Sequence, residues 1–247
     1  MNVFEIKGGN PNIGMTTRDG TSGPERDLID AFLPFIPSCF RWRKGAVAIF
    51  HEPYIETGFP DLVVVHYNPS VFDKWTPARS KLRPLDLKLL HHLFHTNGGE
   101  TEVLLKVLGL DRRVFLSAIE RLLNAEMVTQ AREKWMPRPL RSVFGIKTIV
   151  AIEAKIKNWS DAFQQAQLDQ WFASETYVLS PIEKPSQSVL ERSQRTGVGV
   201  LVLNGKRVRR LKNANKWSLP ASYGSWMFNE WIGRYIYEGQ VEKYGDY

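Results

Sequence analysis

Two apolar, β-branched runs carry isolated charges, and this feature most constrains how the chain can fold. The runs cover residues 57–65 and 149–156, and each has the composition of a buried strand. Asp61 lies in the first run, and Glu153 and Lys155 lie in the second. An unpaired carboxylate or ammonium inside a sheet costs several kcal/mol, so these groups need compensation. A divalent cation held by Asp61 and Glu153 at the edge of a sheet would supply it.

Strand geometry predicts how these groups are arranged. Side chains two positions apart share a face, so Glu153 and Lys155 project together while Ala154 turns to the opposite layer. With Asp61 on a neighbouring strand, this gives two hard oxygen ligands and one cation. Mg²⁺ prefers a few carboxylates plus waters and substrate phosphates, and Mn²⁺ can substitute for it. Lys155 would position a nucleophilic water or stabilise developing negative charge, which is the chemistry of a nuclease.

The residues also carry a family resemblance. Pro60-Asp61, followed by Glu153-Ala154-Lys155, resembles the signature of the PD-(D/E)xK nuclease superfamily, whose fold is restriction-endonuclease-like. The resemblance covers residues 24–66 and 143–212. It implies an α/β fold with a mixed central sheet flanked by helices.

The resemblance also implies roles for further residues. Glu25, on a helix before the first core strand, matches an additional acidic metal-site group, although Glu56 is a rival for that role. Gln165, on the helix after the second run, resembles a glutamine placed near the active site. The catalytic set implied is therefore Asp61, Glu153, Lys155, Glu25 and Gln165, with Asp61, Glu153 and Glu25 at the metal.

The chain departs from the family pattern in spacing, because about ninety residues separate Asp61 from Glu153. Residues 81–141 account for the excess if they form an insertion between two core strands, whose ends must then lie close together. Their pattern of three short helices followed by a β-ribbon resembles a winged helix-turn-helix domain. The nuclease core would be discontinuous and comprise residues 1–80 and 142–247.

Local patterns predict the elements of this core. Residues 1–23 have no periodicity, which is typical of a loosely structured lead-in, and the helix that follows should stop at Pro37. The expected strands cover residues 45–51, 61–67, 144–157, 177–179 and 197–203. The expected helices cover residues 160–174, 186–195 and 223–241.

The basic charge of the chain favours a polyanionic partner. The net charge is +7 and the sequence pI is about 9.5. DNA contact is expected from the start of the third inserted helix, from the wing, and from a basic run near the C-terminus. The residues in these three places are Arg112 and Arg113; Lys134, Arg138 and Arg141; and Arg207, Arg209 and Arg210.

Composition sets the expected compartment. Cys39 is the sole cysteine, which excludes an intrachain disulfide and suits a reducing environment. The first residues lack the apolar region of a signal peptide, and no apolar run reaches the roughly 18 residues of a membrane helix. A cytoplasmic protein without a membrane partner is expected.

These patterns lead to a functional prediction: a Mg²⁺-dependent DNA endonuclease aided by an inserted winged helix. The main alternative is a non-catalytic DNA-binding regulator built on a degenerate nuclease core. A nuclease acting on RNA or branched DNA is a third hypothesis, because a fold does not encode its substrate. Cutting both strands with one site per chain would favour either a homodimer or sequential nicks.

Overall fold

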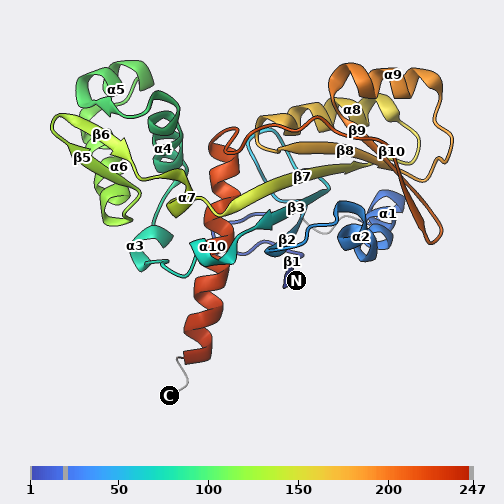
Figure 1. The fold of residues 1–247 in the computed structure, drawn as a ribbon, viewed down its shortest axis with the longest axis horizontal. Coiled ribbons are helices and arrows are strands. Elements are labelled where there is room, and N and C mark those ends of the chain that lie inside the picture. Colours follow the sequence, from blue (N-terminus) through green and yellow to red (C-terminus); the bar gives the residue numbers. More distant parts are fainter. Residues whose placement is uncertain (1, 19–21, 245–247) are drawn as a thin grey trace. The chain divides into compact units, whose positions relative to one another are not determined.

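A computed structural model describes residues 2–18 and 22–244, with side chains described through residue 239. The chain divides into two compact units (Figure 1). The first unit comprises residues 1–68 and 146–224, and the second comprises residues 69–145 and 225–247.

The first unit is an α/β structure built on one mixed, seven-stranded sheet, which confirms the expected class. In spatial order the strands are β1 (Val3–Ile6), β2 (Ala46–His51), β3 (Leu62–Tyr67), β7 (Ile146–Ala154), β8 (Glu175–Ser180), β9 (Gly199–Asn204) and β10 (Arg207–Lys212). The pairs β1–β2, β7–β8 and β8–β9 are parallel, whereas β2–β3, β3–β7 and β9–β10 are antiparallel.

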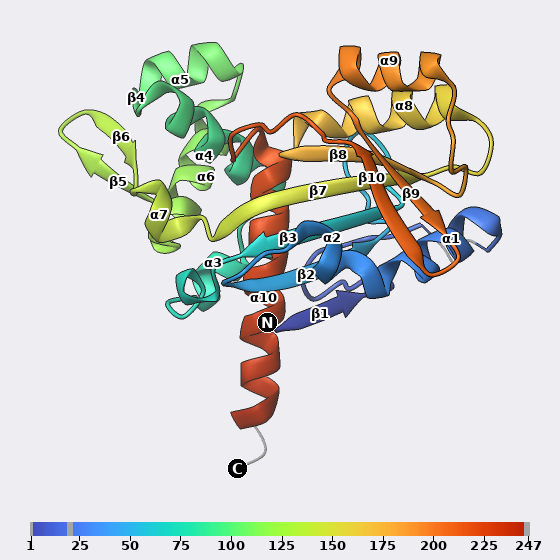
Figure 2. The same cartoon turned by 45° about the vertical axis from the view of Figure 1, so that its right-hand side comes forward.

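Helices cover both faces of this sheet (Figure 2). Side chains alternate along each strand, so the buried strands present apolar side chains to both layers of helices. One face packs against α1 (Pro24–Phe32), the 3₁₀ turn η1 (Leu33–Phe35) and α2 (Ile36–Phe40). The other packs against α8 (Trp159–Leu168) and α9 (Gln187–Thr196), and the 3₁₀ turn η3 (Asp169–Trp171) follows α8. On β7, Ile152 and Ala154 face the α1 side.

The pairing of β3 with β7 solves the spacing problem set by the sequence. Leu62 pairs with Ile152, so Asp61 and Glu153, one position further along each strand, become neighbours. At the opposite end, Tyr67 pairs with Ile146. The chain therefore leaves the sheet after β3 and returns to it at an adjacent position, which allows a long insertion without breaking the sheet.

Two local expectations are wrong. The N-terminal segment is more ordered than the expected loosely structured lead-in, because β1 forms an edge strand in which Val3 pairs with Val47. Pro37 does not end the helical region, which continues to Phe40 and closes at Arg41 in a left-handed conformation. Pro37 is tolerated because it lies in the first turn of α2, where the missing N–H would have no intrahelical acceptor.

The second unit combines helices with a small antiparallel sheet in the order β4-β6-β5. Its elements are the 3₁₀ turn η2 (Pro69–Val71), α3 (Pro77–Ser80), α4 (Pro84–Thr96), β4 (Gly99–Glu100), α5 (Thr101–Leu108), α6 (Arg112–Asn124), β5 (Val128–Ala131), β6 (Lys134–Pro137), α7 (Leu140–Val143) and most of α10 (Tyr223–Tyr244). Buried Phe115, Ile119 and Leu122 recur at helical spacing along α6 and supply its core face. The Asp111 carboxylate caps that helix by accepting from the Arg113 N–H at 2.8 Å.

The boundaries of the second unit differ from the expected 81–141, because residues 69–80 and the C-terminal helix belong to it. A buried ion pair joins these segments: Arg79 Nε and Nη2 donate to the Glu230 carboxylate at 3.0 and 2.9 Å. Trp75 lies against Gly233, which has no room for a Cβ atom. These partners are more than 150 residues apart, so no local pattern reveals them.

Replacing Arg79 by Met should lower the free energy of unfolding by about 3–5 kcal/mol, because Glu230, 1% exposed, would be left buried and unpaired. Urea denaturation followed by circular dichroism measures the loss. Arg112→Met is the control, since its pair with Glu102 is exposed and should contribute little. The double variant Arg79→Met/Glu230→Met should recover much of the loss, and a double variant as unstable as the single would contradict this account.

Candidate functional site

The candidate site lies where β3 begins and β7 ends. Asp61 immediately precedes β3, and Glu153 is the penultimate residue of β7. The Asp61 Oδ2 atom accepts a hydrogen bond from the Ala154 N–H at 2.8 Å. This is the only hydrogen bond to the Asp61 side chain among the described residues, so the carboxylate is fixed in position and keeps acceptor capacity.

Lys155 follows the last residue of β7 and is held by a carboxylate from another layer. Its Nζ lies 2.7 Å from Glu25 Oε2 in the first turn of α1, and its N–H donates to the Leu179 carbonyl at 2.9 Å. Burial would lower the pKa of the Lys155 ammonium. The hydrogen bond with Glu25 and the nearby charges of Asp61 and Glu153 outweigh burial and raise that pKa. Lys155 is therefore a fixed cation beside the carboxylates.

Glu153 is buried and shares a hydrogen bond with Asp169, in the turn η3 after α8. The two residues are only 2% and 4% exposed. Burial, together with the charges of Asp169 and Asp61, raises the pKa of Glu153 well above its ordinary value, and burial also raises the pKa of Asp169. A hydrogen bond between two carboxyl groups requires that one of them carry a proton. Among the described residues, Asp169 Oδ2 has no hydrogen-bond partner.

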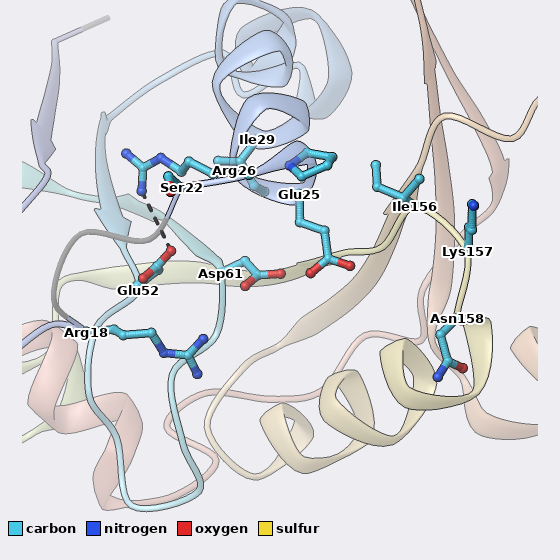
Figure 3. A pocket seen from close by; sticks show the side chains of 12 residues that line it. Arg18, Ser22, Glu25, Arg26, Ile29, Glu52, Asp61, Ile156, Lys157 and Asn158 are labelled. Carbon is cyan, nitrogen blue, oxygen red and sulfur yellow. Dashed lines mark ion pairs between the residues drawn. The ribbon is translucent and has the colours of Figure 1, made fainter.

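A pocket of about 520 Å³ opens beside Asp61. Figure 3 shows Asp61 and Glu25 at its centre, with Glu52 nearby and the start of the β7–α8 loop on the far side. Glu52 is paired with Arg26 at 3.9 Å. Burial, and then the charges of Glu25 and Glu52, raise the pKa of Asp61, although the Ala154 N–H and Lys155 oppose this shift. Glu153 does not line the pocket.

This concentration of carboxylates suits a hard divalent cation. Asp61 and Glu153 offer oxygen atoms as ligands, and the described residues leave Asp169 Oδ2 without a hydrogen-bond partner. Within the described part of the chain, no three His, Cys, Asp or Glu side chains form a ready-made metal cage. Mg²⁺ is commonly held by one or two carboxylates, with waters and substrate phosphates completing its shell, so the residues present fit it.

The remaining candidate site residues are not all at the pocket. Gln165 is exposed on α8 and does not line it. Glu56, the rival of Glu25, accepts a hydrogen bond from the Tyr223 hydroxyl and also does not line it. Of the two acids, Glu25 is the one that lies beside Asp61 and Lys155.

The expected DNA-contacting residues of the second unit are all exposed, on several elements. Arg112 and Arg113 start α6, and Arg112 is paired with Glu102. Lys134 starts β6, which pairs with β5, and Arg138 follows it, as expected for a wing. Arg141 lies outside this hairpin, on the short helix α7.

The basic run near the C-terminus lies on β10. Because side chains alternate along a strand, Arg207 and Arg209 project from one face and Arg210 from the other. Arg207, Arg209 and Arg210 are all exposed, but Arg210 also makes contacts with the protein. Its Nη2 donates to the Cys39 carbonyl at 2.7 Å, and its guanidinium lies 5.2 Å from the Phe40 ring centroid. The structure therefore leaves Arg207 and Arg209 available to a partner and assigns Arg210 a packing role.

Sequence reasoning missed three residues of this site: Asp169, Glu52 and Arg18. Asp169 follows a helix, and Glu52 and Arg18 lie in connections, so none has a strand context that would mark it. The sequence did hold a weak signal for Glu52, an acidic residue directly after an apolar strand. Asp61 has the corresponding position directly before an apolar strand. Only the tertiary structure brings these residues together.

Comparisons of the chain with protein-family models, curated proteins and solved structures returned no significant match. None of the described helices is long and apolar enough to cross a membrane. The function is therefore inferred from the geometry of the site.

Glu153→Gln should stabilise the metal-free protein by roughly 0.5–2 kcal/mol at alkaline pH, because it removes a buried charge and keeps a hydrogen-bond donor toward Asp169. A carboxyl with a raised pKa in the folded state costs stability as the pH rises from its ordinary value of 4.5 through the raised one. The gain should therefore shrink toward pH 4.5.

Thermal and urea unfolding in EDTA at several pH values measures this gain. Glu191→Gln, at an exposed position on α9, is the matched control and should change little. A Glu153→Gln protein less stable than wild type at alkaline pH would contradict the assignment of an unfavourable buried charge.

Proposed function

We propose that this chain is a Mg²⁺-dependent DNA endonuclease with a restriction-endonuclease-like core. One observation carries the proposal: Asp61 and Glu153 are neighbours across β3 and β7, while Lys155 Nζ is held 2.7 Å from Glu25 beside them. The mixed sheet with helices on both faces supports the fold part of the proposal.

Asp61 and Glu153 would hold Mg²⁺, and Glu25 at the pocket would supply a further oxygen; Mn²⁺ is the expected substitute. When bound, the ion would stabilise charge on the phosphodiester and lower the pKa of a water molecule. Binding requires Glu153 to release the proton that it shares with Asp169, so the pair would load metal more readily as the pH rises.

The protein side chains have distinct roles in this mechanism. The backbone N–H of Ala154 fixes the Asp61 carboxylate, so one oxygen is oriented before substrate arrives. Glu25 holds the Lys155 ammonium in place and favours its charged form. Lys155 would donate a hydrogen bond to the attacking water or to a phosphate oxygen on which negative charge grows.

The second unit supports the DNA-binding part of the proposal. Helices α4, α5 and α6 followed by the hairpin β5–β6 have the order of a winged helix-turn-helix, in which the third helix commonly enters the major groove. The start of α6 exposes Arg112 and Arg113, which suits contact with base edges or phosphates.

A non-catalytic DNA-binding regulator is the second candidate. The observation that favours it is the burial of Glu153, which does not line the pocket and bonds to Asp169. In that case the carboxyl pair would be a structural remnant, and DNA binding alone would be the function.

Cleavage of supercoiled plasmid in Mg²⁺ separates the two candidates. Wild type should nick or linearise the plasmid, and Asp61→Ala and Lys155→Ala should each slow the reaction by about 100-fold or more. Glu56→Gln is the matched acidic control and should cut like wild type, whereas Glu25→Gln should be slower. Wild type that binds duplex tightly but leaves plasmid, linear DNA and single strands intact would favour the regulator.

Binding of duplex DNA to Arg112→Ala/Arg113→Ala tests the second unit separately. If both side chains contact phosphates, affinity should fall and the slope of log K against log salt should decrease by about 2. Fluorescence anisotropy over a series of KCl concentrations in EDTA measures both. Unchanged affinity and slope would remove the proposed role of α6, while a DNA-cleavage activity would still stand.

A further inference from the structure

Two cations, Arg18 and Lys157, lie on the wall of the pocket. Figure 3 shows them on opposite sides of the Asp61 and Glu25 carboxylates. Among the described residues, neither Arg18 nor Lys157 forms an ion pair, whereas Lys155 is paired with Glu25. These are the positively charged groups of the pocket that remain available to a ligand.

Arg18 is held in place by contacts with uncharged groups. Its backbone N–H donates to the Glu52 carbonyl at 3.2 Å, next to an isolated β-bridge between Thr17 and Pro53. Its guanidinium lies 5.1 Å from the centroid of the Phe59 ring. Stacking on an aromatic ring restricts a guanidinium without neutralising it, so less freedom is lost when an anion binds.

Lys157 lies on the other side of the pocket, in the loop between β7 and α8. Its side chain is exposed, and the next residue, Asn158, caps α8 by accepting from the Asp161 N–H. The N-terminus of a helix carries partial positive charge, which reinforces the attraction of Lys157 for an anion.

The distribution of charge fits a chain of phosphates better than a single anion. The carboxylates at the centre repel an anion unless a cation intervenes. Each side of the pocket offers one positive group that forms no ion pair with a described residue. A nucleic-acid strand presents negative charges at regular intervals and can satisfy both sides at once. We infer that Arg18 and Lys157 bind the phosphates that flank the scissile one, so that a DNA strand crosses the pocket between them. This inference rests on the proposed nuclease function.

The test is binding of a short fluorescein-labelled DNA duplex in EDTA, over a series of KCl concentrations. Arg18→Ala and Lys157→Ala should each reduce the slope of log K against log salt by about 0.9 and weaken binding on the order of five- to ten-fold at moderate salt. The double variant should show both losses. In Mg²⁺, each single variant should raise KM for plasmid cleavage more than it lowers kcat. The reason is that a contact with a flanking phosphate stabilises the bound substrate and the transition state equally.

Two substitutions outside the pocket are matched controls. Arg192 lies 5.3 Å from the Phe163 ring centroid and so resembles Arg18 in its stacking, and Lys147 is an exposed lysine at the opposite end of β7 from Lys155. Arg192→Ala and Lys147→Ala should keep the wild-type slope. Arg18→Gln replaces Arg18→Ala if circular dichroism shows that the alanine variant is unfolded.

The outcomes separate this inference from the proposed function. A wild-type slope in either Arg18→Ala or Lys157→Ala, equal losses in the controls, or no duplex binding by wild type would overturn the inference. If wild type cuts DNA but the Arg18 and Lys157 variants keep the wild-type salt slope, the nuclease proposal is supported and the phosphate contacts are not. If the slopes change as expected but no cleavage occurs in Mg²⁺ or Mn²⁺, the phosphate contacts stand and the nuclease proposal fails.

Discussion

The antiparallel pairing of β3 with β7 is the constraint on which the rest of the first unit depends. It joins two apolar strands that lie about ninety residues apart and places Asp61 beside Glu153 at one end. At the other end it places Tyr67 beside Ile146, so the intervening segment leaves and re-enters the sheet at adjacent positions. The same ladder therefore builds the candidate site and accommodates the insertion.

The site concentrates charge where a sheet normally excludes it. Asp61, Glu153 and Asp169 all have raised pKa values, and burial is the first cause in each case. Such a cluster opposes folding of the metal-free protein, because like charges in a poorly solvated place repel one another. Lys155 offsets part of this repulsion, and a bound cation would offset more. Carboxylates gathered in this way are therefore better explained by a binding site than by a structural role in the core.

The second unit has its own stabilising interactions and is not merely a loop between two strands. The buried pair of Arg79 and Glu230 connects a helix near the start of the insertion to the C-terminal helix. This explains why the unit begins at residue 69 and includes residues after 224, although helical periodicity alone suggested residues 81–141. Composition could not reveal that boundary, because both partners lie in ordinary helical sequence.

The sequence by itself determined the local structure. Its strands at residues 45–51, 61–67 and 144–157, and the helices that follow them, lie within a few residues of their expected positions, because apolar periodicity and caps act over short distances. It also marked Asp61, Glu153 and Lys155 as charges that an apolar strand does not explain. Only the tertiary structure decided which acid lies beside Lys155, that Asp169 contacts Glu153, and that Arg210 bonds to the Cys39 carbonyl. Those outcomes depend on contacts between segments far apart in the chain, about which local propensity carries no information.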